Sequence, residues 1–418
     1  MIRTANLGYP RIGQKRELKF SLEQYWKNNL PISELTQTAE HIQLVNWQIQ
    51  KENGMDVIPS NDFSFYDHVL DTVSMLGAIP ERFLIPELAE KHDRYFAMAR
   101  GFHSNQTGNI HALEMTKWFN TNYHHLVPEI SSDTTLLLDP EKIINSYTLS
   151  KKAGFDTRPV LLGPVSFLLL SKSHHPGFNP LFKLPDFLEI YQQLFETCFR
   201  NSIEWLQLDE PFLVCDLNQE SKMAYKSLFD FIHHAILRPK LMLTTYFADI
   251  QKNMDVISKS SCEGIHIDCT NTSDFFAILP QLPKVESLSL GIIDGRNVWR
   301  ADLYGIMETI KETVGQKLVP DILLAPSCSL IHVPQDVILE DHIDEDIKPW
   351  LSFAKQKLEE LNSLKDSINN GYLPNALFNV NKTNLENRKA FQARKISQTS
   401  IDGSTENHDD QAYQRHSP

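Results

Sequence analysis

Short apolar runs alternate with helical stretches along most of this chain, and this alternation restricts the fold more than any other feature of the sequence. Each run is continuous and rich in Leu or β-branched residues, which is typical of parallel strands covered on both faces. The runs stand at 159–163, 205–208, 241–246, 264–267, 288–293 and 322–325. Two further strands are predicted near Leu7 and Val57, so the pattern indicates eight βα units.

Eight parallel strands with helices between them favour an α/β fold of the closed (β/α)8 type, a TIM-type barrel, over an open doubly wound sheet. The segment 63–133 is rich in aromatic residues and is expected to form irregular helical insertions, and a spare run at 134–138 has the composition of an additional strand. The main helices are predicted at 31–53, 140–153, 186–203, 221–237, 248–260, 272–282, 302–314 and 343–369.

One domain is expected over residues 1–380, followed by a flexible C-terminal linker or mobile tail over 381–418. Past Phe378 the composition shifts to Asn, Lys, Ser, Asp and Gln. Residues 400–418 contain almost no apolar side chain, so burial cannot offset the conformational entropy that ordering would cost.

Composition and charge exclude several classes of protein. The formal net charge of -13 argues against a nucleic-acid-binding surface, which needs Lys and Arg clustered over a wide face. No apolar run approaches the roughly 20 residues that span a bilayer, and the first residues lack the apolar core of a signal peptide. The five cysteines are scattered and form no C-x-x-C pair, which predicts a reducing, cytoplasmic setting. The expected partner is a small molecule.

A basic cluster stands out in this acidic chain, at a Gly/Pro turn that leads from the first strand into a helix. It consists of Arg11, Lys15, Arg16 and Lys19. Free backbone N–H groups at the start of a helix already favour anions. The cluster is therefore either a solvated helix face or a socket for a small molecule that carries several carboxylates.

Lys117 is a second cation in an unusual context, because it precedes Trp118 and Phe119 and lies near Tyr123. A cation beside large flat side chains suits a ligand with an aromatic ring and a carboxylate. The alternative is a lysine whose aliphatic stem covers a buried aromatic cluster.

Polar residues follow most of the predicted strands, at the end where barrel enzymes carry their chemistry. Such residues also cap the helices that follow. The adjacent carboxylates Asp209 and Glu210 are the strongest pair, although neighbours on a strand point to opposite faces and make a poor acid/base pair. One of them is expected to face the lumen, where binding an ammonium group fits better than general-base catalysis.

A zinc site is not predicted. The candidate ligands at strand ends are His266, Asp268, Cys269 and Cys328. They lie on different strands without an H-x-C or C-x-x-C pair, and zinc needs three or four converging ligands. The sequence also lacks a Walker loop, a Gly-rich dinucleotide turn and a nucleophile elbow.

Several collinear motifs resemble one known family. They are L-G-Y-P-R-I-G-Q-K-R-E-L-K at 7–19, E-M-T-K-W-F-N-T-N-Y-H at 114–124, R-P-V-L-L-G-P-V-S at 158–166, W-L-Q-L-D-E-P at 205–211, G-I-I-D-G-R-N-V-W-R-A-D at 291–302 and S-C-S-L-I-H at 327–332. They resemble the N-terminal half of cobalamin-independent methionine synthase, a methyltransferase of methionine biosynthesis. That enzyme moves a methyl group from 5-methyltetrahydropteroyltri-L-glutamate, a folate, to homocysteine.

The resemblance implies where a ligand binds in this chain. The family's N-terminal barrel holds the folate's polyglutamate tail, and the matching positions here are Arg16, Glu17, Leu18, Lys19 and Lys117. The family's zinc, homocysteine pocket and proton donor belong to a second, C-terminal barrel. The resemblance therefore implies no catalytic residue, no metal ligand and no cofactor in this chain.

Three functions stay open on this basis. The first is that of an enzyme half, which works with a separate C-terminal barrel. The second is that of a stand-alone folate-binding paralogue, and the third is that of an inactive remnant. In each case the isolated chain is expected to lack methyl-transfer activity, with no nucleic-acid or membrane partner.

Overall fold

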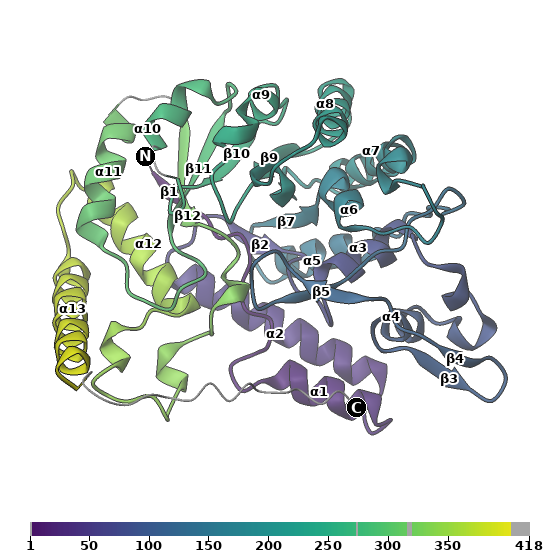
Figure 1. Cartoon of the computed structure of the whole chain (residues 1–418), viewed down its shortest axis with the longest axis horizontal. Helices are drawn as coiled ribbons and strands as arrows, with labels where there is room; N and C mark the ends of the chain where they lie inside the picture. Colours follow the sequence, from purple (N-terminus) through teal and green to yellow (C-terminus); the bar gives the residue numbers. More distant parts are fainter. Residues whose placement is uncertain (1, 273–274, 316–319, 403–418) are drawn as a thin grey trace.

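The computed structural model describes residues 2–272, 275–315 and 320–402. Its centre is one 8-stranded sheet in the order β1-β12-β11-β10-β9-β8-β7-β2, and every strand pair is parallel (Figure 1). The strands are β1 (Arg3–Thr4), β2 (Ile58–Ser60), β7 (Thr157–Leu162), β8 (Trp205–Asp209), β9 (Lys240–Thr244), β10 (Gly264–Asp268), β11 (Ser287–Ile293) and β12 (Asp321–Pro326).

The two edge strands meet and close the sheet into a barrel. Ala5, just after β1, forms a parallel bridge with Val57, just before β2. The Asn6 N–H donates to the Val57 carbonyl at 3.0 Å, and the Val57 N–H donates to the Thr4 carbonyl at 3.0 Å. The predicted (β/α)8 fold is therefore confirmed: six strands overlap the six apolar runs, β2 begins next to Val57, and β1 lies a few residues before Leu7.

Helices surround the barrel and cover the outer face of the strands (Figure 1). Strands β10 and β11 are buried along their whole length, as expected when one face packs on helices and the other fills the lumen. The helices are α1 (Glu17–Trp26), α2 (Ile32–Glu52), α3 (His68–Leu76), α4 (Lys91–Arg100), α5 (Glu141–Lys152), α6 (Pro164–Leu170), α7 (Leu184–Arg200), α8 (Gln219–His234), α9 (Met254–Ile257), α10 (Phe275–Ile278), α11 (Leu303–Gly315), α12 (Ala354–Asn369) and α13 (Ala376–Asp402).

Two small hairpins belong to the insertion between β2 and β7. One pairs β3 (Phe102–Ser104) with β4 (Gly108–Ile110), and the other pairs β5 (Met115–Lys117) with β6 (His124–Leu126). The spare run at 134–138 forms no strand. Instead the Leu137 N–H donates to the Leu76 carbonyl at 3.0 Å, which ties this segment to the end of α3.

Three predicted helices are shorter in the structure. Only Met254–Ile257 of 248–260 is α-helical, and 272–282 contains the short α10 next to residues outside the described part. The helix predicted at 343–369 begins at Ala354, because residues 350–352 pair with residues 298–300: the Arg300 N–H donates to the Trp350 carbonyl at 3.0 Å and the Ser352 N–H to the Val298 carbonyl at 2.8 Å.

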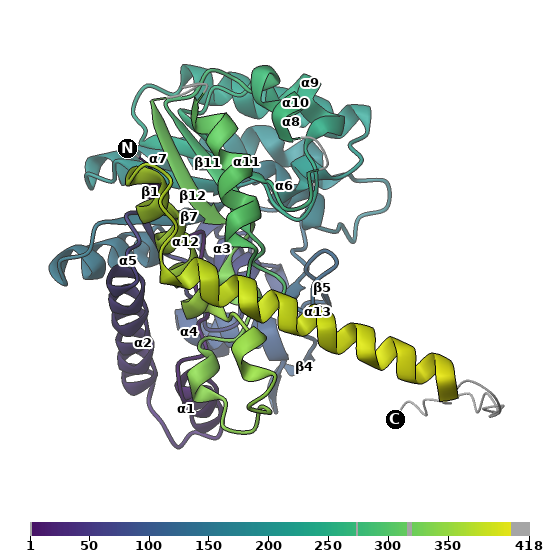
Figure 2. The same ribbon diagram turned by 90° about the vertical axis from the view of Figure 1, so that its left-hand side faces the viewer.

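The C-terminal segment is helical as far as Asp402. The first turn of α13 is anchored, since Phe378 is fully buried and its ring lies 5.2 Å from the Tyr304 ring. Further along, the Arg388 guanidinium lies 4.7 Å from the Trp299 ring and the Phe391 ring 5.3 Å from the Trp350 ring, and Figure 2 shows the last turns of α13 extending away from the barrel. The predicted boundary between 380 and 381 falls inside this helix, residues 403–418 lie outside the described part, and the division into domain and linker stays a prediction.

Across the described ranges, no helix combines the length and the apolar character that a membrane crossing requires.

Candidate functional site

The tip of the β5–β6 hairpin lies over the C-terminal ends of the barrel strands. The Phe119 ring is 5.1 Å from the Phe212 ring after β8 and 5.7 Å from the Phe247 ring after β9. The Tyr123 ring is 5.6 Å from the His332 ring after β12. The aromatic run that follows Lys117 therefore forms a cap that packs on three separate strand ends.

Backbone and polar contacts hold this cap in place. Within the tip, the Trp118 N–H donates to the Tyr123 carbonyl at 2.8 Å. From the barrel side, the Arg296 guanidinium after β11 donates to the Asn120 carbonyl at 3.0 Å, and its charge lies 5.1 Å from the Phe247 ring centre.

A cavity of about 80 Å³ lies beneath the cap, at the mouth of the barrel. Its walls come from the segments after β1, β2, β9 and β12, from the ends of β7 and β8, from α3 and α5, and from the cap itself. The polar and aromatic residues that line it are Arg11, Asn61, Asp62, Ser64, Asp67, His68, Asp71, Trp118, Tyr123, Lys142, Asp209, Tyr246, Ser329 and His332.

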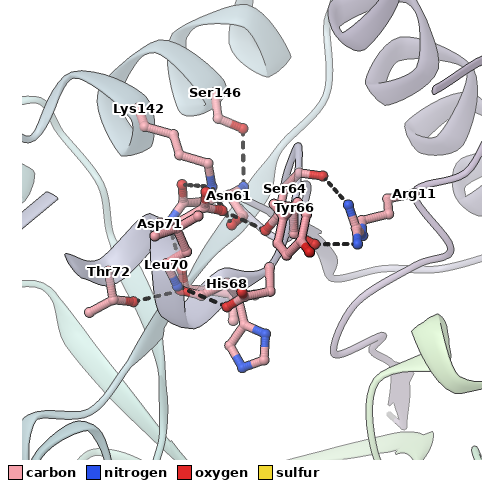
Figure 3. A network of polar contacts seen from close by, with 12 residues as sticks. Arg11, Asn61, Ser64, Tyr66, His68, Leu70, Asp71, Thr72, Lys142 and Ser146 are labelled. Atoms are coloured by element: carbon pink, nitrogen blue, oxygen red, sulfur yellow. Dashed lines mark hydrogen bonds and ion pairs between the residues drawn. The ribbon is translucent and has the colours of Figure 1, made fainter. Parts of the chain in front are cut away.

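One wall of the cavity is a dense polar network centred on Asp71 (Figure 3). Its carboxylate accepts hydrogen bonds from the Ser64 hydroxyl at 2.5 Å and the Tyr95 hydroxyl at 2.8 Å, and it forms an ion pair with Lys142 at 3.2 Å. The Lys142 ammonium also donates to the Asn61 side-chain oxygen at 2.9 Å. Asn61 has φ 59°, a left-handed conformation that these contacts stabilise.

Arg11 belongs to the same wall. Its guanidinium donates to the Ser64 carbonyl at 2.6 Å and to the Tyr66 carbonyl, as Figure 3 shows. By sequence Arg11 belongs to the basic cluster at the start of α1, but these two hydrogen bonds attach its side chain to the β2–α3 loop.

Three carboxyl groups of the cavity have no ion pair with any Lys or Arg in the described part of the chain: Asp62, Asp67 and Asp209. Burial raises the pKa of all three, to about 7 for Asp67 and to about 7 for Asp209. Backbone N–H groups of Leu70 and Leu126 donate to Asp67 and oppose its shift, but desolvation outweighs them.

Two histidines of the cavity are neutral. Burial lowers the pKa of His68 to about 3 and the pKa of His332 to about 4. The His68 ring packs edge-to-face on the Trp118 ring at 4.4 Å. Neither imidazole has a hydrogen-bond partner among the described residues, and Figure 3 shows the His68 ring standing free of the network.

Of the adjacent carboxylates Asp209 and Glu210, one lines the cavity and the other caps a helix. Glu210 is fully buried and caps α6, accepting hydrogen bonds from the Ser166 N–H at 2.8 Å and the Val165 N–H at 3.2 Å. Asp209 lines the cavity and accepts from the Gln207 amide at 2.9 Å and the Tyr246 hydroxyl at 3.3 Å.

The sequence-predicted ligand residues lie outside this cavity. Arg16 is the residue before α1, with φ 62°, and Lys19 lies in the first turn; both are exposed. Glu17 accepts from the Lys15 N–H at 2.9 Å, and Leu18 is buried at 1% exposure, so these two fix the turn to the core.

Lys117 ends β5 and is exposed at the edge of the cap. Among the described residues, neither its ammonium nor the Arg16 guanidinium has a hydrogen-bond or ion-pair partner, and no such contact joins Lys117 to α1. Lys19 has one weak contact, with Glu23 at 3.9 Å. We call the three predicted tail-binding cations, Arg16, Lys19 and Lys117, the cationic rim, a name that implies no contact between Lys117 and the other two.

The four candidate zinc ligands do not fit a metal ion. His266 pairs with the Ser289 hydroxyl at 2.8 Å, and Asp268 accepts from Thr270 and Asn271. The Cys269 thiol contacts the Ile267 carbonyl at 3.6 Å and the Cys328 thiol contacts the Ser329 carbonyl at 3.6 Å.

Within the described ranges, no three His, Cys, Asp or Glu side chains gather as a metal site would require. The absence of a cofactor in this chain stays a prediction.

The sequence analysis missed the Asp71–Lys142 network and the free histidines. Asp67 directly precedes α3 and caps it, and an Asp at such a position is the kind of residue from which the start of a helix can be predicted. No spacing connects Lys142 to Asn61, because the whole insertion separates them along the chain.

Residues 3–317 match the family model described as cobalamin-independent synthase, N-terminal domain. Over 393 residues the chain is 42% identical to a 5-methyltetrahydropteroyltriglutamate–homocysteine methyltransferase of Xylella fastidiosa (strain M23), which covers 94% of this chain and 51% of that protein. The enzyme of the same description from Mesorhizobium japonicum is 41% identical over 381 residues, covering 88% of this chain and 49% of that protein. The chain thus spans about half the length of the curated relatives it matches.

Among solved structures, a B12-independent methionine synthase from Shewanella sp. W3-18-1, in complex with selenomethionine, has a similar fold. The TM-score is 0.60 at 13% sequence identity, and the match covers 89% of this chain and 99% of that chain. At this identity the likeness supports the fold alone.

Proposed function

This chain belongs to the family of the cobalamin-independent synthase N-terminal domain, and we propose that it binds the polyglutamate tail of 5-methyltetrahydropteroyltri-L-glutamate. The proposed contacts are those of Arg16, Glu17, Leu18, Lys19 and Lys117. In this role the chain holds the methyl donor for transfer to homocysteine in methionine biosynthesis.

The observation that carries this proposal is the unpaired charge of the cationic rim. Arg16 and Lys117 have no hydrogen-bond or ion-pair partner in the described part, and Lys19 only touches Glu23 at 3.9 Å, so all three charges are available to a ligand. A γ-linked triglutamate supplies several carboxylates in a row. Charge-assisted hydrogen bonds from guanidinium and ammonium groups to carboxylates are the strong class of such bonds.

The start of α1 adds to this preference for anions. Arg16 precedes the helix, no side chain caps the first turn, and the unsatisfied N–H groups of a helix start attract negative charge. Glu17 and Leu18 hold this turn in place, while Arg16 and Lys19 point their charges outward.

We propose further that the isolated chain transfers no methyl group and works with a separate C-terminal barrel. The transfer needs a thiolate at neutral pH, and a zinc ion supplies one by lowering the pKa of a bound thiol. In the part of the chain that the structure describes, no three His, Cys, Asp or Glu side chains gather as such a zinc site would require. The five cysteines are all free thiols, in keeping with a cytoplasmic setting.

Titration calorimetry of the full chain tests the tail-binding role. Pteroyltriglutamate is expected to bind more tightly than pteroylmonoglutamate, and Lys19→Ala and Lys117→Ala should each weaken triglutamate binding by about fivefold to tenfold while leaving monoglutamate binding unchanged. Lys226→Ala removes an exposed, unpaired lysine on α8 and serves as the matched control. Equal affinity for the two folates, or no effect of either substitution, would refute the proposal.

A methyl-transfer assay separates the remaining alternatives. An enzyme half is inactive alone and active when the C-terminal barrel of a relative is added. A stand-alone folate-binding paralogue binds the tail but is inactive both alone and with the added barrel. An inactive remnant shows neither tail binding nor activity. Turnover by the chain alone would contradict the second proposal.

A further inference from the structure

The cavity at the barrel mouth has a charge pattern opposite to that of the cationic rim. Asp62, Asp67 and Asp209 line it without an ion pair, while both of its cations are committed to the protein. Arg11 donates to two backbone carbonyls, and Lys142 is held by Asp71 and Asn61. No cation in the described part of the wall is left to pair with the three carboxyl groups.

Unpaired carboxyl groups in a shielded cavity are unfavourable unless something compensates them. Arg11 lies near enough to Asp67, and Arg158 near enough to Asp209, to lower the pKa of each group, yet burial still raises both pKa values to about 7. A positive group placed in the cavity would stabilise the ionised forms that burial disfavours.

The histidines provide a second and independent indication. Imidazoles that are neutral have one ring nitrogen that accepts a hydrogen bond. His68 and His332 line the cavity with no hydrogen-bond partner in the described residues, so each offers a free acceptor to a bound N–H group. Each ring also keeps one N–H, but as neutral groups the two imidazoles add no positive charge that would repel a bound cation.

Aromatic rings complete the wall. Trp118, Tyr123 and Tyr246 line the same cavity, and the faces of such rings attract cations. Carboxylates, neutral imidazoles and aromatic faces therefore favour one ligand chemistry, a positively charged group with several N–H donors.

We propose that the capped cavity at the barrel mouth binds the ammonium group of a small primary amine, with Asp209 as its principal carboxylate and His68 as a hydrogen-bond acceptor. A cavity of about 80 Å³ accommodates a few non-hydrogen atoms, so the ammonium end of the ligand enters and any longer chain must pass the cap. This site is separate from the cationic rim and does not depend on tail binding.

Nuclear magnetic resonance of the full chain with ¹⁵N-labelled tryptophan tests this site. The Trp118 indole signal, assigned with a Trp118→Phe variant, reports on the cavity. Methylammonium chloride should shift this signal saturably, whereas sodium acetate and methanol at matched ionic strength should not. Absence of a saturable shift with methylammonium, or an equal response to acetate, would overturn the proposal.

Variants then locate the carboxylate. Asp209→Asn should weaken methylammonium binding by at least about tenfold, since a charge-assisted hydrogen bond is lost. Asp216→Asn alters an exposed acid paired with Lys252 and should leave binding unchanged. An unchanged affinity in a folded Asp209→Asn variant would contradict the assignment. If this variant does not fold, the comparison of methylammonium with acetate on the unaltered chain still decides the proposal.

Discussion

The barrel mouth and the cationic rim differ in whether protein groups hold their charged side chains in place. At the mouth, Asp71 contacts Ser64, Tyr95 and Lys142, and the two cations of the wall, Arg11 and Lys142, are both held by protein groups. At the rim, Arg16 and Lys117 are exposed and unpartnered in the described part of the chain. The mouth is fixed before any ligand arrives, whereas the rim keeps its charges available for one.

This difference explains why charge alone is a poor guide to function in this chain. Arg11 and Arg16 are close in sequence and equal in charge, but Arg11 holds the β2–α3 loop and Arg16 faces solvent. Truncation of the packed and hydrogen-bonded residues at the mouth should therefore lower stability, and substitution of the rim cations should weaken binding of the folate tail.

The largest effect is expected from Trp118→Ala in the cap. Trp118 is 3% exposed and packs on His68 at 4.4 Å and on Phe119 at 4.9 Å, so truncation leaves a cavity. Loss of a buried Trp costs about 3–5 kcal/mol in the free energy of unfolding. Urea denaturation measures it, with truncation of the exposed Phe20 as control. A change below about 1 kcal/mol would show that the cap is loosely held.

Asp71→Ala should follow, with a loss of about 2–4 kcal/mol. The substitution removes the acceptor for two hydroxyl groups and leaves Lys142 without its ion pair. Glu286→Ala breaks the exposed ion pair with Lys240 and should cost less than about 1 kcal/mol. Equal losses in the two variants would remove the contrast between the mouth and an ordinary surface.

The pH dependence of Asp209 gives a smaller and reversible effect. Burial raises its pKa from 3.8 to about 7, so the folded chain binds a proton between these values that the unfolded chain releases. The Asp209 contribution to stability is therefore present below about pH 4 and is lost as pH rises through about 7. Relative to Asp209→Asn, the unaltered chain should lose about 1–3 kcal/mol between pH 5 and pH 8.

Denaturation of the unaltered chain and of the Asp209→Asn variant at several pH values measures this difference in stability. A gap between the two chains that does not change with pH would mean that Asp209 is hydrated rather than buried. Asp255→Asn, at the exposed pair with Lys222, should show no such dependence.

Arg16→Gly should produce the smallest effect on stability, and in the opposite direction. Arg16 has φ 62°, which glycine adopts without the steric cost that other residues incur. A gain of about 0.5–1 kcal/mol is expected, together with weaker binding of pteroyltriglutamate. A loss of stability, or unchanged binding, would mean that Arg16 serves the fold rather than the ligand.

The barrel was predictable from the sequence because parallel strands buried on both faces are rich in continuous apolar residues, as residues 241–243 in β9 and 322–325 in β12 show. The helix predicted from 343 was wrong in its first turns, since residues 350–352 pair with the distant segment 298–300. The site was predictable only in part. The division of roles between Asp209 and Glu210 followed from strand geometry, but which residue faced the lumen did not.

The interior of the site depends on contacts that sequence spacing does not encode. Lys142 reaches Asn61 and Asp71 only because α5 packs beside the β2–α3 loop. The cap is similar: Trp118, Phe119 and Tyr123 were recognised as an aromatic group beside Lys117, but the strand ends on which they pack were not.

Competition by the tail alone tests the central claim most directly. Free tri-γ-glutamate, which lacks the pteridine, should displace pteroyltriglutamate from the full chain, and Lys117→Ala should weaken both ligands by the same factor. Failure of the free tail to compete at any concentration, while pteroyltriglutamate still binds, would contradict the assignment of the cationic rim.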